Sequence, residues 1–199
     1  EAEVVGRAPA QGVRVHVLRV GLRRPRDLTG ARRRGPVGPD EGLAAVVLKR
    51  RADAERDGDR IYALVRAVAG GSDGRSKSMT APRLEGQVRT LNRAYAQARI
   101  DPSTIGLFEA HGTGTSLGDP IEIQGIQAAY AADRPADPAQ SCAVGSVKSN
   151  LGHLESAAGI TGLLKVILSL RHRQLPASVH FSELNPKIRL QDTPFVIQD

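Results

Sequence analysis

Aromatic side chains are scarce in this chain of 199 residues, which contains three Phe, three Tyr and no Trp. A platform that stacks unpaired nucleic-acid bases needs such rings, so the composition disfavours one. The single cysteine, Cys142, excludes an internal disulfide framework and a cysteine-rich zinc site, and we expect no metal ion. No apolar run approaches the ~20 residues of a membrane helix, and no secretory leader is visible. These absences predict a cytoplasmic protein with no membrane partner.

Positive charge is concentrated in the first fifth of the sequence. The chain has 28 Lys and Arg against 21 Asp and Glu, a net charge of +7. Nine arginines lie within residues 1–39 beside three acidic residues, so this segment alone carries +6. A basic arm of this kind can neutralise phosphates, which leaves nucleic-acid binding open as a minor alternative.

The sequence divides at residue 42 into two parts of different character. In the basic segment 1–41, only residues 13–20 alternate between apolar and polar like a strand. The stretch that follows is crowded with Arg, Gly and Pro and has no apolar period. Its composition is typical of a flexible loop or of an out-of-frame reading of GC-rich DNA, and both remain open. Residues 42–199, by contrast, have apolar residues at the regular spacings of strands and helices.

In the regular part, strands alternate with helices. Short apolar runs predict strands over residues 43–48, 61–69, 105–110 and 142–147. Helical periodicity and terminator residues predict helices over residues 50–57, 84–100, 120–131 and 154–173. This alternation predicts an α/β layered domain with buried strands. Small residues at the start of the last helix should pack closely against neighbours: Ala157, Ala158, Gly159 and Gly162.

Two glycine-rich loops follow predicted strands, and each carries a histidine. The first runs from His111 to Pro120, and the second holds Lys148 five residues before His153. Loops beyond the ends of strands are where α/β proteins place their sites. Neither loop has the spacing of a phosphate-binding loop. The G-x-S-x-G match at residues 70–74 lacks the helix that a nucleophile elbow requires.

Two histidines beside a lysine suit chemistry at a thioester carbonyl. Neutral imidazoles donate N–H hydrogen bonds to an oxyanion or enolate, and an ammonium group adds positive potential. Carbon–carbon bond formation or cleavage beside a thioester requires both, so His111, Lys148 and His153 are the candidate catalytic residues. The other histidines are predicted to be structural or solvated: His16, His172 and His180. Glu155 either supports Lys148 or caps the helix that follows, and we favour the cap.

The two loops resemble the histidine motifs of β-ketoacyl synthase (ketosynthase) domains of type I polyketide synthases, in the thiolase superfamily. The first motif is Glu109-Ala-His-Gly-Thr-Gly-Thr-Ser-Leu-Gly-Asp-Pro-Ile-Glu122, and the second is Val144-Gly-Ser-Val-Lys-Ser-Asn-Leu-Gly-His-Leu-Glu-Ser-Ala-Ala-Gly159. The resemblance extends from about Glu41 to Asp199. It implies an α/β thiolase-like fold with layers αβαβα, of which this chain holds the C-terminal half.

The resemblance implies an acyltransferase that performs a decarboxylative Claisen condensation. In this family a cysteine thiolate accepts an acyl chain from carrier-protein phosphopantetheine, and a malonyl-type extender loses CO2 and attacks the acyl-cysteine. By this resemblance His111 and His153 stabilise the enolate and the thioester oxyanion, Lys148 orders the site electrostatically, and Thr113 and Thr115 bind the pantetheine arm. No bound cofactor is implied. The implied partners are the acyl carrier protein and the acyltransferase domain of the same synthase, in a homodimer.

The nucleophile of the family has no counterpart in this sequence. Residues 1–42 contain no cysteine, and Cys142 lies in an apolar strand, where a structural role is expected. We therefore expect this chain alone to be inactive and to expose a large apolar patch where the other half of the domain belongs. A catalytically silent partner of a complete ketosynthase is the alternative, which the absent nucleophile favours and the two intact histidines disfavour.

Overall fold

The computed structural model describes residues 13–21, 42–74, 81–130 and 142–198. Its helices are α1 (Arg51–Arg56), α2 (Leu84–Ala98), α3 (Gly118–Tyr130), α4 (Lys148–Leu151) and α5 (Ala158–His172). Its strands are β1 (Val13–Gly21), β2 (Leu43–Arg50), β3 (Ala63–Val65), β4 (Leu107–Glu109), β5 (Cys142–Gly145) and β6 (Phe195–Ile197). Short 3-10 helices cover Pro102–Thr104 and Glu155–Ala157. Apart from β1, the basic segment 1–41 lies outside the described residues, and the boundary at residue 42 stays a prediction.

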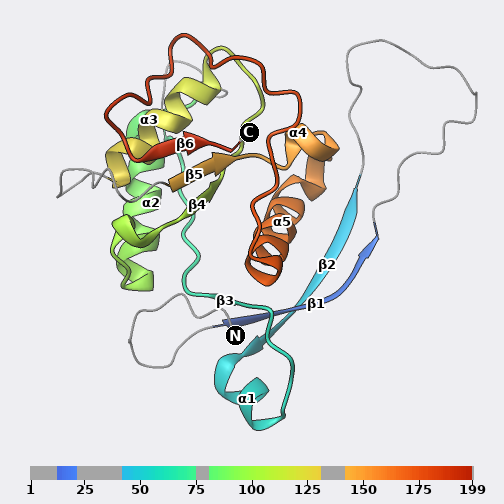
Figure 1. Ribbon diagram of the computed structural model, residues 1–199. Helices are drawn as coiled ribbons and strands as arrows, with labels where there is room; N and C mark the ends of the chain where they lie inside the picture. Colours follow the sequence, from blue (N-terminus) through green and yellow to red (C-terminus); the bar gives the residue numbers. More distant parts are fainter. Residues whose placement is uncertain (1–12, 22–41, 75–80, 131–141, 199) are drawn as a thin grey trace, which may run out of the picture.

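The strands form two separate sheets. β1 lies between β2 and β3 in an antiparallel sheet, and β5 lies between β4 and β6 in a parallel one. Figure 1 shows α2 and α3 on one side of the parallel sheet and α5 on the other. α5 contacts β4 and also β2, so the antiparallel sheet lies beyond it. The described residues therefore form four layers in the order helix, sheet, helix, sheet.

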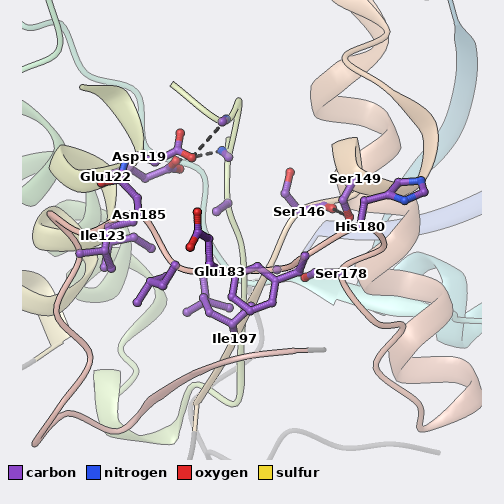
Figure 2. Close-up of a pocket in the computed structure, with 18 of the residues that line it drawn as sticks. Asp119, Glu122, Ile123, Ser146, Ser149, Ser178, His180, Glu183, Asn185 and Ile197 are labelled. Carbon is purple, nitrogen blue, oxygen red and sulfur yellow. Dashed lines mark hydrogen bonds between the residues drawn. The ribbon is translucent and has the colours of Figure 1, made fainter. Parts of the chain in front are cut away.

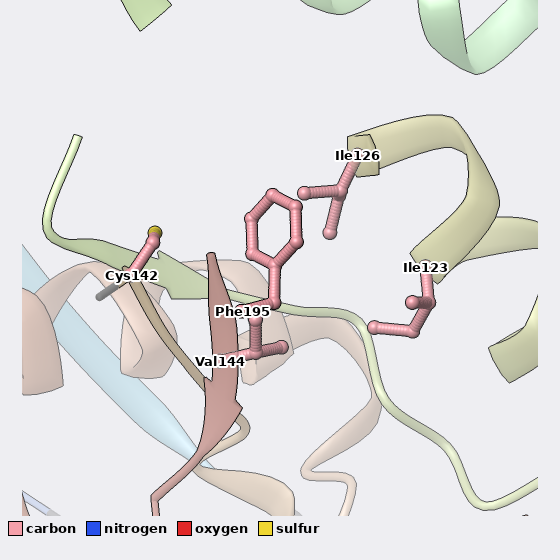
Figure 3. Close-up of a cluster of buried hydrophobic side chains, with 5 residues drawn as sticks. All are labelled: Ile123, Ile126, Cys142, Val144 and Phe195. Atoms are coloured by element: carbon pink, nitrogen blue, oxygen red, sulfur yellow. The ribbon is translucent and has the colours of Figure 1, made fainter. Parts of the chain in front are cut away.

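The main hydrophobic core lies between the parallel sheet and α3. Ile123 and Ile126 of α3 contact the buried side chains of Val144 and Phe195 on β5 and β6 (Figure 3). The Phe195 ring also meets the ring of Tyr130, with 5.0 Å between the centroids in an edge-to-face arrangement. Burial of these side chains fixes α3 on the sheet, and the beginning of α3 is where the first histidine loop ends.

The parallel pairing of β4 with β5 brings the two predicted histidine loops together. Glu109 lies opposite Gly145 in the register, and the N–H of Ala110 donates to the carbonyl of Gly145 at 2.8 Å. Because parallel strands end at the same edge of a sheet, the loops that follow β4 and β5 leave side by side. This edge is where the candidate site lies.

Most helix boundaries agree with the local sequence signals. α2 ends at Ala98, and Arg99 then takes a left-handed conformation with φ 51°. Asp101 then caps the start of the 3-10 helix Pro102–Thr104, because its carboxylate accepts the N–H of Ser103 at 3.0 Å. Pro120 lies in the first turn of α3, where its missing N–H costs nothing. Within the described residues, no helix has both the length and the apolar character to cross a membrane.

The prediction of buried strands is wrong for β2. Leu43 is 75% exposed and Leu48 is 55% exposed. Ala44 and Val46 are half-buried, so only alternate side chains are shielded. An antiparallel sheet needs cover on one face only, and here α5 provides it. An apolar run alone therefore did not distinguish a strand buried on both faces from a strand covered on one.

Two other predictions are corrected in their extent. The strand expected over residues 61–69 is reduced to Ala63–Val65, because only these residues pair with β1. The last helix begins at Ala158, four residues later than expected. Of its small residues, Gly162 packs closely against Glu109, whereas a Cβ on Gly159 would meet nothing within 4 Å. The sequence did not predict α4 or β6.

Candidate active site

The structure brings the two predicted histidines together at the edge of the parallel sheet. His111 and His153 lie with their ring centroids 5.5 Å apart and their planes at 90°. His111 follows β4 and is exposed, whereas His153 follows α4 and is half-buried. Within the described residues, the buried Nδ1 of His153 has no hydrogen-bond partner. Buried polar atoms are normally paired, so this nitrogen is available to a hydrogen-bond partner that the chain itself does not supply.

The backbone at His111 is held by a carboxylate from α3. Glu122 accepts the N–H of His111 through Oε1 at 2.6 Å and the N–H of Gly112 through Oε2 at 3.0 Å. Both oxygens of one side chain are therefore used on adjacent amides. This bidentate contact fixes the direction in which the chain leaves β4, and with it the position of the His111 side chain.

The tip of the same loop is held by a second carboxylate at the start of α3. Asp119 accepts the N–H groups of Gly114 and Thr115, at 3.1 Å and 3.3 Å. Figure 2 shows the carboxylates of Asp119 and Glu122 turned towards the backbone of the loop. Negative side chains are also favoured near the positive end of a helix dipole. The sequence Gly-Asp-Pro-Ile-Glu that begins α3 therefore holds the first histidine loop.

Gly112 is required by both its conformation and its surroundings. Its φ is +48°, and a Cβ there would lie 2.8 Å from the Cβ of Ser146. Ser146 follows β5 and donates its hydroxyl to the carbonyl of His111 at 3.3 Å. The glycine thus permits the first loop to approach the second directly.

Lys148 begins α4, just beyond β5. Its backbone N–H donates to Ser146 Oγ at 3.3 Å, and its carbonyl accepts the N–H of Gly152 at 2.9 Å. Within the part of the chain that the structure describes, no carboxylate forms an ion pair with its ammonium group. Its side chain is half-buried. Its role in the site stays a prediction.

A left-handed turn separates His153 from α5. Leu154 and Glu155 have φ values of 52° and 43°, and the Leu154 side chain is only 6% exposed. Successive non-glycine residues in this region are strained, so the surrounding packing must hold them. Ala157 precedes α5 without any side-chain cap, so the prediction that Glu155 caps this helix is wrong. Among the described residues, Glu155 also makes no ion pair with Lys148.

The two threonines predicted to bind pantetheine lie on the first loop. Thr113 is half-buried and Thr115 is exposed. Thr115 Oγ accepts the N–H of Gly118 at 3.1 Å, which leaves its hydroxyl hydrogen free to donate to a ligand. Their role in binding stays a prediction.

A cavity of about 470 Å³ adjoins the first loop, where Gly112 and Gly114 are among the residues that line it. Figure 2 shows Asp119 and Glu122 on one side of it and Ser146, Ser149 and Ser178 on the other. The segment 178–186 closes it, and sequence patterns gave no sign that this irregular segment returns to the sheet edge. Neither candidate histidine is among the residues that line this cavity.

Cys142 has the environment of a structural residue. Its side chain is fully buried in β5, and burial raises the pKa of its thiol to about 12. A thiol with such a pKa is protonated at neutral pH, whereas the attacking species in acyl transfer is the thiolate. This agrees with the structural role that the sequence predicted.

Two charged residues that meet beside the first histidine loop were not predicted from the sequence. Glu109 is the last residue of β4, and Lys165 lies in α5; their Oε2 and Nζ atoms are 2.9 Å apart. Glu109 was visible as the first residue of the first motif, two positions before His111. Lys165 was visible as a lone charge between Leu164 and Val166. Neither signal showed that the two residues meet.

Solved structures with this arrangement are ketosynthase domains. A ketosynthase domain of oxazolomycin biosynthesis from Streptomyces albus JA3453 is 45% identical with a TM-score of 0.77, over 80% of this chain and 27% of that one. The ketosynthase from module 6 of the bacillaene synthase of Bacillus subtilis 168 is 37% identical with a TM-score of 0.76, over 79% and 28%. The thiolase-like α/β fold is therefore confirmed, for part of the domain.

The family model of the β-ketoacyl synthase C-terminal domain matches residues 62–182. The chain belongs to the β-ketoacyl synthase family. Among curated relatives, polyketide synthases PksL and PksM of Bacillus subtilis are 44% identical over 160 residues and 48% identical over 158 residues. These matches cover 80% and 79% of this chain but only 4% of each relative.

Proposed function

We propose that this chain is a fragment of a polyketide β-ketoacyl synthase and carries that enzyme's enolate and oxyanion binding groups. The observation that supports this most directly is the perpendicular pair of His111 and His153, whose rings lie 5.5 Å apart. Two imidazoles so placed can each donate an N–H to oxygen atoms of substrates lying between or beside them. Their backbone positions are fixed by Glu122 on one side and by the Leu154 turn on the other.

The proposed reaction is a decarboxylative condensation. The bond between the malonyl carboxylate and the α-carbon breaks, CO2 leaves, and the electron pair is delocalised onto the thioester oxygen as an enolate. The α-carbon then attacks the carbonyl of an acyl-cysteine, which forms the new C–C bond and a tetrahedral oxyanion. This intermediate collapses to the β-ketoacyl thioester as the C–S bond breaks and the cysteine thiolate leaves. N–H groups of His111 and His153 stabilise the negative oxygens in the two steps, and the positive charge of Lys148 favours both.

The nucleophilic cysteine of this reaction is not Cys142, whose thiol is buried and protonated. In the proposed enzyme the nucleophile comes from outside this chain. Substrates reach it on the phosphopantetheine arm of an acyl carrier protein, to which Thr113 and Thr115 donate hydrogen bonds. The extender is loaded by the acyltransferase domain of the same synthase, and the complete enzyme works as a homodimer in the cytoplasm.

Substitution of the histidines in a longer ketosynthase with the same residues tests the assignment. His111→Ala and His153→Ala are each expected to lower turnover of malonyl thioester at least 100-fold, because one oxyanion donor is worth about this factor. His172→Ala, at the exposed end of α5, is the matched control and should leave turnover unchanged. Unchanged turnover in both site variants would refute the assignment.

The purified 199-residue chain tests the absence of a nucleophile. With acyl and malonyl thioesters it is expected to yield no β-ketoacyl product, because its only thiol is inaccessible. Formation of that product, detected by mass spectrometry, would show that Cys142 or another group in the chain accepts the acyl group.

A further inference from the structure

A buried ion pair lies at the base of the first histidine loop, since Glu109 is two residues before His111. Lys165 Nζ is 2.9 Å from Glu109 Oε2, and their side chains are 7% and 11% exposed. By contrast, the ion pair between Arg51 and Glu55 of α1 lies at the surface, where these side chains are 43% and 50% exposed. Removing two charges from water is costly, and a buried pair is often no more stabilising than apolar residues of similar size. Its presence therefore calls for a role other than stability.

Glu109 uses its second oxygen on the other histidine-bearing segment. Oε1 accepts the backbone N–H of Val147 at 2.5 Å. Val147 directly precedes Lys148, and Glu109 itself lies two residues before His111. Lys165 lies in α5, the helix that follows His153. One carboxylate thus links the three segments that carry the candidate catalytic residues.

Two glycines leave the space that the pair occupies. A Cβ on Gly162 would lie 3.1 Å from Glu109 Cγ, and a Cβ on Gly145 would lie 3.1 Å from Lys165 Nζ. Gly162 belongs to α5 and Gly145 is the last residue of β5. Each of these elements therefore has no side chain at the place where it faces the Glu109–Lys165 pair. The fit leaves the carboxylate little freedom to move.

From this geometry we propose that Glu109 and Lys165 form a positioning unit that sets the spacing of the segments bearing His111, Lys148 and His153. The unit touches neither substrate nor reacting atoms. It acts by holding the end of β4, the start of α4 and the helix α5 at one mutual distance. The proposal rests on the proposed function only for its effect on turnover, because its effect on the histidine rings can be measured without any reaction.

Three substitutions separate positioning from simple stabilisation. Glu109→Gln keeps an oxygen for the Val147 N–H but leaves Lys165 buried without a counter-charge. The double variant Glu109→Gln/Lys165→Met removes both charges and should recover the stability lost in the single variant. Glu109→Asp keeps the charge but shortens the side chain by one methylene. Glu85→Gln, at an exposed site in α2, is the matched control.

The first measurement uses the 199-residue chain and needs no catalysis. Two-bond 1H–15N spectra report the tautomer and surroundings of each imidazole. In the double variant, the ring signals of His111 and His153 are expected to shift relative to the parent chain, while that of His172 stays fixed. Unchanged signals for both candidate histidines in the double variant and in Glu109→Asp would overturn the proposal.

The second measurement uses a longer ketosynthase that carries the same residues. The double variant and Glu109→Asp are expected to lower kcat about 100-fold with KM within twofold, because an error of about 1 Å in catalytic geometry has an effect of this size. A double variant with both parental stability and parental kcat would overturn the positioning role. If His111→Ala and His153→Ala both left turnover unchanged, the proposed function would fail, and the ring signals would still decide the inference.

Discussion

The link between Glu122 and the first histidine loop gives a prediction whose size follows from the structure. Glu122→Ala removes the acceptor of two backbone N–H groups, those of His111 and Gly112. A hydrogen bond to a charged group contributes about 1.5–3 kcal/mol when buried. Glu122 is half-buried, so the lower value applies to each bond. We expect the free energy of unfolding to fall by about 3 kcal/mol, since Glu and Ala have similar helix propensities.

Urea denaturation of the 199-residue chain, followed by far-ultraviolet circular dichroism, measures this loss. Gln124→Ala is the matched control, because Gln124 lies two residues along the same helix and is exposed. It should change the free energy of unfolding by less than about 0.5 kcal/mol. Glu122→Gln retains one neutral acceptor and should cost about half as much as Glu122→Ala.

Hydrogen exchange gives a second, local measure of the same link. The amides of His111 and Gly112 are expected to exchange faster in Glu122→Ala than amides in β5 do, because the loop opens without global unfolding. A loss below about 1 kcal/mol together with unchanged exchange at these two amides would refute the reasoning. It would mean that other contacts hold the histidine loop in place.

Three further outcomes are expected. Ile167→Ala should lower the free energy of unfolding by about 2–5 kcal/mol in urea titrations, because Ile167 is 1% exposed, whereas Leu168→Ala, at a site 43% exposed, should cost far less. Iodoacetamide at pH 7 should modify Cys142 only after denaturant is added, and rapid labelling of the folded chain would contradict its burial. Burial raises the pKa of Cys142 from 9.0 and that of Tyr95 from 10.0 to about 12 each, so the folded chain keeps protons that the unfolded chain releases. Stability should therefore be full below about pH 9 and fall as the pH rises towards 12, and a flat profile in that range would contradict it.

Local sequence signals predicted most of the elements that carry the candidate site, but not α4, which begins with Lys148. Short apolar runs predicted β4 and β5, and helical periodicity predicted α2 and α5. Both signals come from residues that are close together in the sequence. His111 and His153 could be predicted because each lies in a glycine-rich loop after a strand, and parallel pairing then places the loops side by side. For these features the local pattern and the tertiary structure agree.

The rest depends on contacts between distant residues. Leu43 looks buried in the sequence, yet its exposure is decided by which face of β2 meets α5. Glu109 and Lys165 are 56 positions apart, and no periodicity relates the end of β4 to the middle of α5, which follows α3, β5 and α4 in the chain. The left-handed turn at Leu154 could not be predicted either, because a leucine in the sequence does not indicate a positive φ.

The continuity of the candidate site along the chain has a consequence for building chimaeric synthases. The histidine pair, Lys148 and the buried ion pair all lie between β4 and the end of α5, so a transplant of the candidate site would have to carry residues 107–172 together. Contacts that cross its borders include the approach of Gly42 to the Leu154 turn, the pairing of β5 with β6, and the hydrogen bond from Asn150 Nδ2 to the carbonyl of Ala177 at 3.3 Å. A recipient that lacks a small residue at the first of these junctions would displace the second histidine, even though every transplanted residue was retained.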